Sequence, residues 1–349
     1  MFFSQIQGLE EVKNQLITSV ANQHVAHAQS FAASERSETL TMALDFANYI
    51  NCQNKQGKDA CGVCETCSKT KKYIHPDYHF IFPTYNKTKK EASNKEEQRN
   101  QFLTDWRTFL TKNPYAGLSD WANFTKAENK QCTIGIDESR KLLQDVSLKA
   151  FESEYKIFFI WLPEYLNDSA SNSLLKVLEE PPKKTLLFLI TNDLEQILPT
   201  ILSRTQIVHV RPFSDEEIQD SLINQFYKEP IKAKNIAPLA EGNLNIALEL
   251  CEELENDNHL IFKNWMRHAF AADFTQLVGF SDEYQKLTKV QQKGLLKYGM
   301  NIIRELLLFH HGANQLIRVS DEEKQFLQGF AKAVKAVSYT HLRAHETRH

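Results

Sequence analysis

Residues 156–204 read KIFFIWLPEYLNDSASNSLLKVLEEPPKKTLLFLITNDLEQILPTILSR and decide the fold of this chain. The stretch holds two short, almost wholly apolar runs, at residues 156–161 and 186–191, which are typical of strands buried on both faces of a parallel sheet. Between them, Asn167 or Asp168 can cap a helix that has one apolar stripe. The proline pair that follows ends this helix, because proline donates no N–H and its ring clashes with the preceding turn. The spacing predicts a strand, a helix and a second, parallel strand.

The composition is that of an ordinary globular chain. Its 349 residues, of which 24% are charged and 42% hydrophobic, allow two or three domains with separate cores. No apolar run approaches the ~20 residues that span a bilayer. The start, MFFSQIQGLEEV, has no basic region and no small-residue cleavage site, so we expect no signal peptide and a cytoplasmic location. The net charge of −3 gives no general attraction for nucleic acid.

A first core strand at residues 29–32 and a helix at residues 40–50 are joined by ASERSET at residues 33–39. A nucleotide-binding protein would place its phosphate loop at this junction. Such a loop needs glycines, so that backbone N–H groups can close around the phosphates, and a lysine for their charge. This segment has neither, and Glu35 and Glu38 would repel a triphosphate. Its own chemistry argues against a phosphate-binding loop.

Four cysteines crowd into one short interval, at Cys52, Cys61, Cys64 and Cys67. Thiolates at this spacing can converge on one tetrahedral Zn²⁺ ion. Four reduced thiols without metal, or an iron–sulfur cluster, are the alternatives. Zinc is favoured because the surroundings are polar and no other feature indicates redox chemistry. A closed four-cysteine site has no open coordination position, so the metal would be structural.

Residues 86–130 are polar and charge-rich, and we interpret them as an insertion on the surface of the first domain. The basic run KTKK at residues 87–90 could touch a nucleic-acid backbone, but a solvated loop is the favoured interpretation. Trp106, Trp121 and Phe124 could stack on bases. We expect them instead to anchor the insertion to the body of the domain.

The pattern after residue 204 becomes helical. A last short strand is expected at residues 206–210, and Ser214 with Glu217 forms a capping box for the following helix. The final residues, 338–349, read SYTHLRAHETRH and have no apolar periodicity. We interpret them as an unstructured, non-native tail, which would make the helical region before it truncated.

Several segments together resemble bacterial clamp-loader subunits, which belong to the AAA+ superfamily. The resemblance covers residues 1–255 well and the rest loosely. It is carried by the four cysteines and by HAQSF at 27–31, HPDYHFI at 75–81, NSLLKVLEEPP at 172–182 and ILPTILSR at 197–204.

This resemblance implies an α/β fold with a P-loop-like parallel sheet. Residues 1–211 would form the AAA+ core, with the degenerate phosphate loop, the zinc module at 52–67 and the insertion. Residues 212–258 would form a small helical lid, and residues 259–337 an all-helical collar for oligomerisation.

Three nucleotide-handling features of the family's motor subunits are replaced in this chain. These are the glycine-rich loop with its lysine, the acidic pair at the end of the third core strand that holds Mg²⁺, and the arginine of the lid that senses nucleotide. Glu164 stands two residues beyond the strand position that it would need. The resemblance therefore implies no ATP as cofactor and no ATP hydrolysis. The residues now at these positions are Ala33, Arg36, Glu38, Thr39, Trp161, Leu162 and Asn245.

Ser203 and Arg204 are retained from the family's Ser-Arg-Cys motif, with Thr205 in place of the cysteine. In the family this arginine reaches into the ATP site of the neighbouring subunit, where its guanidinium stabilises charge on the γ-phosphate. The resemblance thus implies an arginine finger that acts in trans. The alternative is an ordinary surface arginine before an edge strand.

The combination is similar to the delta-prime class of DNA polymerase III clamp-loader subunits. It implies a catalytically silent member of a ring, with the motor subunits (gamma/tau) and a delta subunit as partners. That ring loads the sliding clamp on primed DNA. An active ATPase motor subunit and a zinc-dependent DNA-binding module remain as alternatives. No Ser/His/Asp arrangement, HExxH motif or paired-carboxylate site stands out, so we propose no hydrolase.

Overall fold

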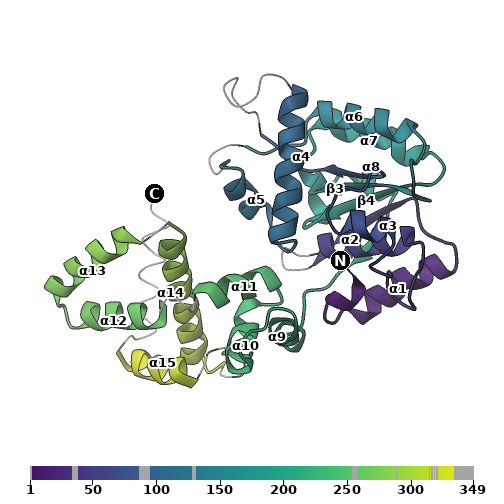
Figure 1. Cartoon of the computed structure of the whole chain (residues 1–349). Helices are drawn as coiled ribbons and strands as arrows, with labels where there is room; N and C mark the ends of the chain where they lie inside the picture. Colours follow the sequence, from purple (N-terminus) through teal and green to yellow (C-terminus); the bar gives the residue numbers. More distant parts are fainter. Residues whose placement is uncertain are drawn as a thin grey trace. The chain divides into compact units, whose positions relative to one another are not determined.

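The chain folds into two compact units in this computed structural model, an α/β unit and a helical unit (Figure 1). The α/β unit comprises residues 1–217 and 242–245, and the helical unit residues 218–241 and 246–349. The finer division of the second half into a lid and a collar stays a prediction. The structure describes residues 2–33, 38–85, 95–127, 131–253, 258–287, 289–313, 315, 317, 319 and 321–333.

A five-stranded sheet forms the centre of the α/β unit, in the order β2-β3-β4-β1-β5. Every neighbouring pair of strands is parallel, which confirms the predicted class of sheet. The edge strand β2 was not predicted, because it has four residues and His79 interrupts its apolar run. The strands are β1 (Ala28–Ala32), β2 (Tyr78–Ile81), β3 (Lys156–Trp161), β4 (Thr185–Thr191) and β5 (Gln206–His209).

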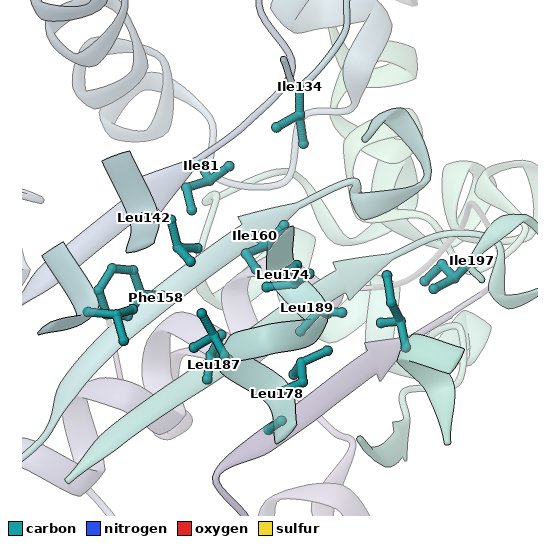
Figure 2. Close-up of a cluster of buried hydrophobic side chains, with 14 residues drawn as sticks. Ile81, Ile134, Leu142, Phe158, Ile160, Leu174, Leu178, Leu187, Leu189 and Ile197 are labelled. Atoms are coloured by element: carbon teal, nitrogen blue, oxygen red, sulfur yellow. The ribbon is translucent and has the colours of Figure 1, made fainter. Parts of the chain in front are cut away.

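Three helices cover one face of this sheet: α6 (Ile136–Ser147), α7 (Asp168–Glu179) and α8 (Pro199–Leu202). Asn167 is the N-cap of α7, since its side chain accepts a hydrogen bond from the backbone N–H of Ala170 at 2.8 Å. The side chains at alternate positions of β3 and β4 meet the apolar stripes of these helices, as Figure 2 shows. The cluster includes Phe158, Ile160, Leu187, Leu189, Leu142, Val146, Leu174, Leu178 and Ile201.

The opposite face of the sheet packs against α2 (Thr39–Asn51). The Phe188 ring lies 5.3 Å from the Phe31 ring and 5.5 Å from the Phe46 ring, between centroids. All residues of α2 are buried, and Cys52 is its C-cap. The helix α2 therefore lies inside the α/β unit and has no exposed face. The remaining elements of the first 75 residues are η1 (Phe3–Gln5), α1 (Glu10–Ala21) and α3 (Glu65–Thr70).

The insertion contributes α4 (Lys95–Lys112) and α5 (Leu118–Phe124), which lie beside β2 and β3 (Figure 1). Trp106 and Trp121 are 0% exposed, and the indole N–H of Trp121 donates to the Pro83 carbonyl at 2.9 Å. Phe124 packs against the Trp121 ring, with 6.2 Å between centroids. The predicted anchoring role is confirmed for Trp106 and Trp121, whereas the ring contacts of Phe124 lie within the insertion itself. The basic run at 87–90 lies outside the described residues.

The helical unit has its own core around α12, α14 and α15, with Phe262, Leu295, Ile302 and Leu327 buried in it. The predicted tail at 338–349 lies outside the described residues. Of the helices that the structure describes, none combines the length and the apolar character needed to span a membrane. From α9 onward the helices are α9 (Asp215–Asn224), α10 (Pro230–Ile236), α11 (Leu244–Glu253), α12 (Asn258–Phe270), α13 (Phe274–Lys286), α14 (Lys289–His310) and α15 (Asp321–Ala333).

The predicted capping box at the start of α9 is confirmed. The backbone N–H of Glu217 donates to the Ser214 hydroxyl at 3.2 Å, and the Ser214 N–H donates to the Glu217 carboxylate at 2.8 Å. Two donors at the helix start are thereby satisfied. Glu217 also binds Arg211, with 2.7 Å between the guanidinium and the carboxylate, and this holds its pKa at about 2 against the opposing effect of its partial burial.

Candidate functional site

At the β1–α2 junction, where a phosphate loop would lie, the structure describes Ala33, Glu38 and Thr39. Ala33 follows β1, and Arg36 lies outside the described residues. Glu38 is the N-cap residue of α2 and is only 4% exposed, and Thr39 beside it is also buried. The hydroxyl of Thr41 donates to the Glu38 carboxyl at 3.1 Å. Burial raises the pKa of Glu38 to about 8.

Trp161 and Leu162 stand at the carboxyl end of β3, where the family's acidic pair would hold Mg²⁺. Both are buried, and the Trp161 ring lies 4.9 Å from the Trp106 ring of the insertion, between centroids. Leu162 has a left-handed backbone with φ of 57°, and its N–H donates to the Ile190 carbonyl at 2.8 Å. Neither side chain can bind a cation or polarise water. The end of β3 is thus part of the core.

Glu164 is the nearest carboxylate to this strand end, and its contacts are structural. It accepts hydrogen bonds from the Thr191 hydroxyl at 3.0 Å and from the Asn192 N–H at 3.3 Å. Burial raises its pKa above the ordinary value. The carboxylate therefore ties the turn after β3 to the end of β4.

Asn245, at the position of the lid arginine, binds the insertion. Its amide oxygen accepts from the Asn113 side chain at 2.6 Å, and its amide nitrogen donates to the Asp120 carboxylate at 3.2 Å. A neutral amide held in this way offers no positive charge to a phosphate. Three positions that the sequence marked as replaced thus hold neutral or buried groups with partners inside the α/β unit.

Arg204 lies at the opposite edge of the sheet. Gln206, at the start of β5, pairs with Gln29 near the start of β1, so Arg204 stands at the amino ends of the strands. Thr205 accepts a hydrogen bond from the Ser30 hydroxyl at 2.8 Å, which fixes the turn on β1. Thr205, which stands in place of the motif's cysteine, therefore anchors this turn to β1.

The guanidinium of Arg204 is held at the surface by groups of α7 and α8. It lies 2.8 Å from the Glu179 carboxylate, donates to the Thr200 carbonyl at 2.8 Å and approaches the Ser203 hydroxyl at 3.3 Å. The side chain is 36% exposed. Sequence reasoning did not identify Glu179 as this partner, although Glu179 belongs to the NSLLKVLEEPP segment that carries the family resemblance.

The four predicted metal ligands come together in one cluster. The sulfur atoms of Cys52, Cys61, Cys64 and Cys67 all lie within 4.8 Å of one another, with 4.0 Å between those of Cys61 and Cys67. Tetrahedral ligands at a Zn–S distance of about 2.3 Å are roughly 3.8 Å apart, so the cluster matches the size of a Zn²⁺ site.

Backbone N–H groups also point at these sulfurs, as a thiolate site requires. The Cys61 N–H donates to the Cys52 sulfur at 3.2 Å, and the Cys64 N–H to the Cys61 sulfur at 3.4 Å. N–H donors at Val63 and Cys64 lower the pKa of Cys61 to about 6. Gly62 has φ of 76°, a left-handed conformation that permits the tight turn between two ligands. The donor set fits a structural Zn²⁺ ion.

His75, Asp77 and Ser153 form a polar group that the sequence did not predict as a unit. The imidazole of His75 accepts from the Asp77 N–H at 3.1 Å, so its other nitrogen, 2.9 Å from the Ser153 hydroxyl, is the donor. A serine that accepts this proton is not activated as a nucleophile. The Asp77 carboxylate accepts three N–H bonds, from residues 151–153, and shapes that loop. The contacts of this group are structural.

The chain is similar in sequence to known proteins. A sequence profile of the family described as "DNA polymerase III, delta subunit" matches residues 8–214. The chain is 25% identical over 328 residues to DNA polymerase III subunit delta' of Bacillus subtilis, covering 92% of this chain and 81% of the relative. It is 24% identical over 277 residues to subunit delta' of Escherichia coli, covering 78% and 67%.

Motor-type subunits and solved structures are also similar to this chain. DNA polymerase III subunit tau of Escherichia coli is 25% identical over 256 residues, which are 72% of this chain and 32% of the relative. A gamma subunit-related protein from Thermotoga maritima has 15% identity and a TM-score of 0.40, with 92% of each chain covered.

Proposed function

Because the chain belongs to the DNA polymerase III delta-subunit family, we propose that it is a delta-prime-like stator of the bacterial replicative clamp loader. Its curated relatives named subunit delta' support a clamp-loader subunit of DNA polymerase III. The finer proposal is that the chain does not hydrolyse ATP and gives Arg204 to a neighbouring subunit's ATP. One observation carries it: of the replaced nucleotide positions that the structure describes, five are buried, whereas Arg204 stays at the surface; the buried ones are Glu38, Thr39, Trp161, Leu162 and Asn245.

The proposed mechanism requires little movement in this chain. A guanidinium near a transferring γ-phosphate stabilises the charge that develops on its oxygens. Arg204 is held by a carbonyl and a carboxylate on the surface turn, so it is positioned before a partner arrives. Exchanging the exposed Glu179 contact for a phosphate costs little, because exposed ion pairs contribute about 0–1 kcal/mol. Ser203 shapes the turn, as its hydroxyl donates to the Thr200 carbonyl at 3.1 Å.

The partners and the location follow from the same proposal. We expect gamma/tau motor subunits and a delta subunit as direct partners in the cytoplasm, and the sliding clamp and primed DNA through the assembled complex. The helices after residue 258 would join the subunits as a collar. Zn²⁺ at the four cysteines would have a structural role, with no step of the reaction at the metal.

Removal of the arginine tests this proposal directly. A loader reconstituted with Arg204→Ala should assemble, while ATP hydrolysis at the adjoining site falls by about 10³-fold, as for other arginine fingers. Arg204→Lys should recover little, because an ammonium cannot reproduce the planar, bidentate geometry. Arg140→Ala, at an exposed arginine of α6, is the matched control and should leave the rate unchanged. An unchanged DNA-stimulated ATPase in an intact Arg204→Ala complex would reject the finger.

Two binding measurements complete the test. The purified chain should show no micromolar ATP binding by calorimetry, whereas an active motor subunit would bind. Metal analysis should give one zinc per chain in wild type and a loss of zinc in Cys64→Ser. Less than about half an equivalent in carefully prepared protein would count against the structural site, since such sites are filled.

A further inference from the structure

The segment that precedes α1 packs on the cysteine cluster. The ring of Phe2 is half-buried and lies against the apolar group that contains the four cysteines. A Cβ atom at Gly62 would lie only 3.0 Å from the tip of this ring, its Cζ atom. Gly62 belongs to the turn between two of the candidate metal ligands, Cys61 and Cys64. The Phe2 ring therefore covers this turn from the side of the α/β unit's first residues.

A carboxylate of the cysteine loop fixes the backbone of the same segment. Asp59 accepts a hydrogen bond from the Phe3 N–H at 3.2 Å and another from the Ser4 N–H at 2.9 Å. These are the first N–H groups of η1, which have no acceptor inside the helix. Asp59 is held in turn by two backbone hydrogen bonds with Gln56, at 2.9 and 3.1 Å. The segment is thus bonded to the loop that carries the metal ligands.

Further contacts join the segment and the cysteine loop to the neighbouring helices. Phe3 is 3% exposed, and its ring lies 5.9 Å from the Tyr49 ring of α2, between centroids. The Tyr49 hydroxyl donates to the Gly57 carbonyl of the cysteine loop at 3.3 Å. The Lys58 ammonium of this loop donates to the Asn14 side chain of α1 at 2.8 Å. The segment and the loop are therefore seated on the same two helices.

An apolar side chain over a metal site has a physical consequence. A competing ligand must reach a metal–sulfur bond before the metal can leave. The apolar shell around a site controls this access, and residues outside the ligand set change metal affinity by about 10–100-fold when they are mutated. Such a coupling is reciprocal: a segment that stabilises bound metal is stabilised by the metal to the same degree.

We propose that Phe2 is an apolar cover of the four-cysteine metal site, and that the segment 2–5 folds with this site as one module. The cover limits the access of competing ligands to the partly buried sulfurs of Cys61 and Cys64. The bound metal in turn keeps the segment on Asp59. The inference rests on the proposed function in one respect, the zinc ion at the four cysteines, and it does not depend on Arg204.

The rate of zinc release from the full chain tests the cover. Zinc-loaded protein is mixed with an excess of the chromogenic chelator pyridylazoresorcinol, and the absorbance of the chelator reports the released metal. Phe2→Ala should release zinc about tenfold faster than wild type. Phe2→Leu should be slower than Phe2→Ala, because leucine keeps an apolar side chain over the turn. Phe274→Ala, at a phenylalanine of α13 that is 74% exposed, is the matched control and should release zinc at the wild-type rate.

Amide hydrogen exchange tests the reverse direction in the wild-type chain. Removal of zinc by the chelator should raise the exchange rate of a peptide that covers residues 2–9 by about tenfold, since the coupling is reciprocal. A peptide from α12 in the helical unit should exchange at the same rate with and without zinc. Exchange of residues 2–9 that does not respond to zinc would show that the segment and the site fold separately.

The outcomes separate this inference from the proposed zinc site. Release from Phe2→Ala within about twofold of wild type, or Phe2→Leu as fast as Phe2→Ala, overturns the cover. A zinc-loaded chain with this result keeps the proposed metal site and loses only the inference. A chain that purifies without zinc overturns both.

Discussion

The two edges of the central sheet differ in how they use their polar groups. At the carboxyl edge, Glu38 is buried, Glu164 is half-buried and accepts from the Asn192 N–H, and Trp161 stands where an acid would be needed. At the amino edge, Arg204 lies on a surface turn with one exposed ion pair. These residues of the carboxyl edge pack against other groups of the chain, whereas the arginine of the amino edge faces outward.

Under the proposed function, this difference would let a nucleotide-binding fold lose one function and keep another. Nucleotide chemistry at the carboxyl edge needs polar groups that remain open to a ligand, and internal partners remove that openness. The Arg204 turn is built from short-range contacts with Thr200, Ser203 and Glu179. Those contacts do not depend on the carboxyl edge, so the two edges can change separately.

The largest expected contrast is in stability. Trp161→Ala should lower the free energy of unfolding by about 3–5 kcal/mol, because it removes a buried indole that contacts Trp106. Arg204→Ala should change it by no more than about 1 kcal/mol, since it removes one exposed ion pair. Denaturant unfolding of both variants measures the contrast. Equal losses of unfolding free energy in the two variants would contradict the difference between a buried Trp161 and an exposed Arg204.

The dependence of stability on pH tests whether Glu38 is buried at the carboxyl edge in its neutral form. Burial raises the pKa of Glu38 from 4.5 to about 8, so the folded chain binds the proton more tightly than the unfolded chain does. The stability that this group contributes is complete below its unfolded pKa and is lost as the pH rises toward its folded pKa. The loss amounts to at most about 1.4 kcal/mol per pH unit.

Glu38→Gln removes this dependence, so the variant should gain stability over wild type as the pH rises through the same window. Asp45 on α2 is also buried, and its pKa is raised to about 8, so the stability of Glu38→Gln should still fall in part as the pH rises. The double variant Glu38→Gln/Asp45→Asn should show a smaller change of stability with pH. Parallel pH profiles for wild type and Glu38→Gln would show that Glu38 is charged in the fold and would contradict its raised pKa.

The smallest effect is expected at the partner of Arg204. Glu179→Gln removes the charge that faces the guanidinium, and the free energy of unfolding should change by about 0.2–1 kcal/mol. The change should shrink as salt is added, because exposed charges are screened. Thermal unfolding at low and high ionic strength measures it. A loss of several kcal/mol would mean that the Arg204 turn is as deeply integrated as the carboxyl edge.

Local patterns in the sequence predicted much of this structure. The runs around β3 and β4 fixed the type of sheet, the Ser214 and Glu217 pair predicted the start of α9, and the spacing of the four cysteines predicted one cluster. In each case the residues that interact are close in sequence or share a periodic pattern. The physical cause is then visible in the sequence itself.

Long-range contacts could not be predicted in this way. The pairing of Asn245 with Asn113 and Asp120 has no signature near any of the three residues, because they meet only in the folded chain. The short strand β2 was missed because His79 interrupts its apolar run, so the segment shows neither an unbroken apolar run nor a strict alternation.

The helix α2 (Thr39–Asn51) has Glu38 as its N-cap residue and Cys52 as its C-cap residue. Its 13 residues are all buried, and a helix of that number is about 20 Å long. One buried helix therefore joins a candidate metal ligand at one end to the buried Glu38 carboxyl at the other.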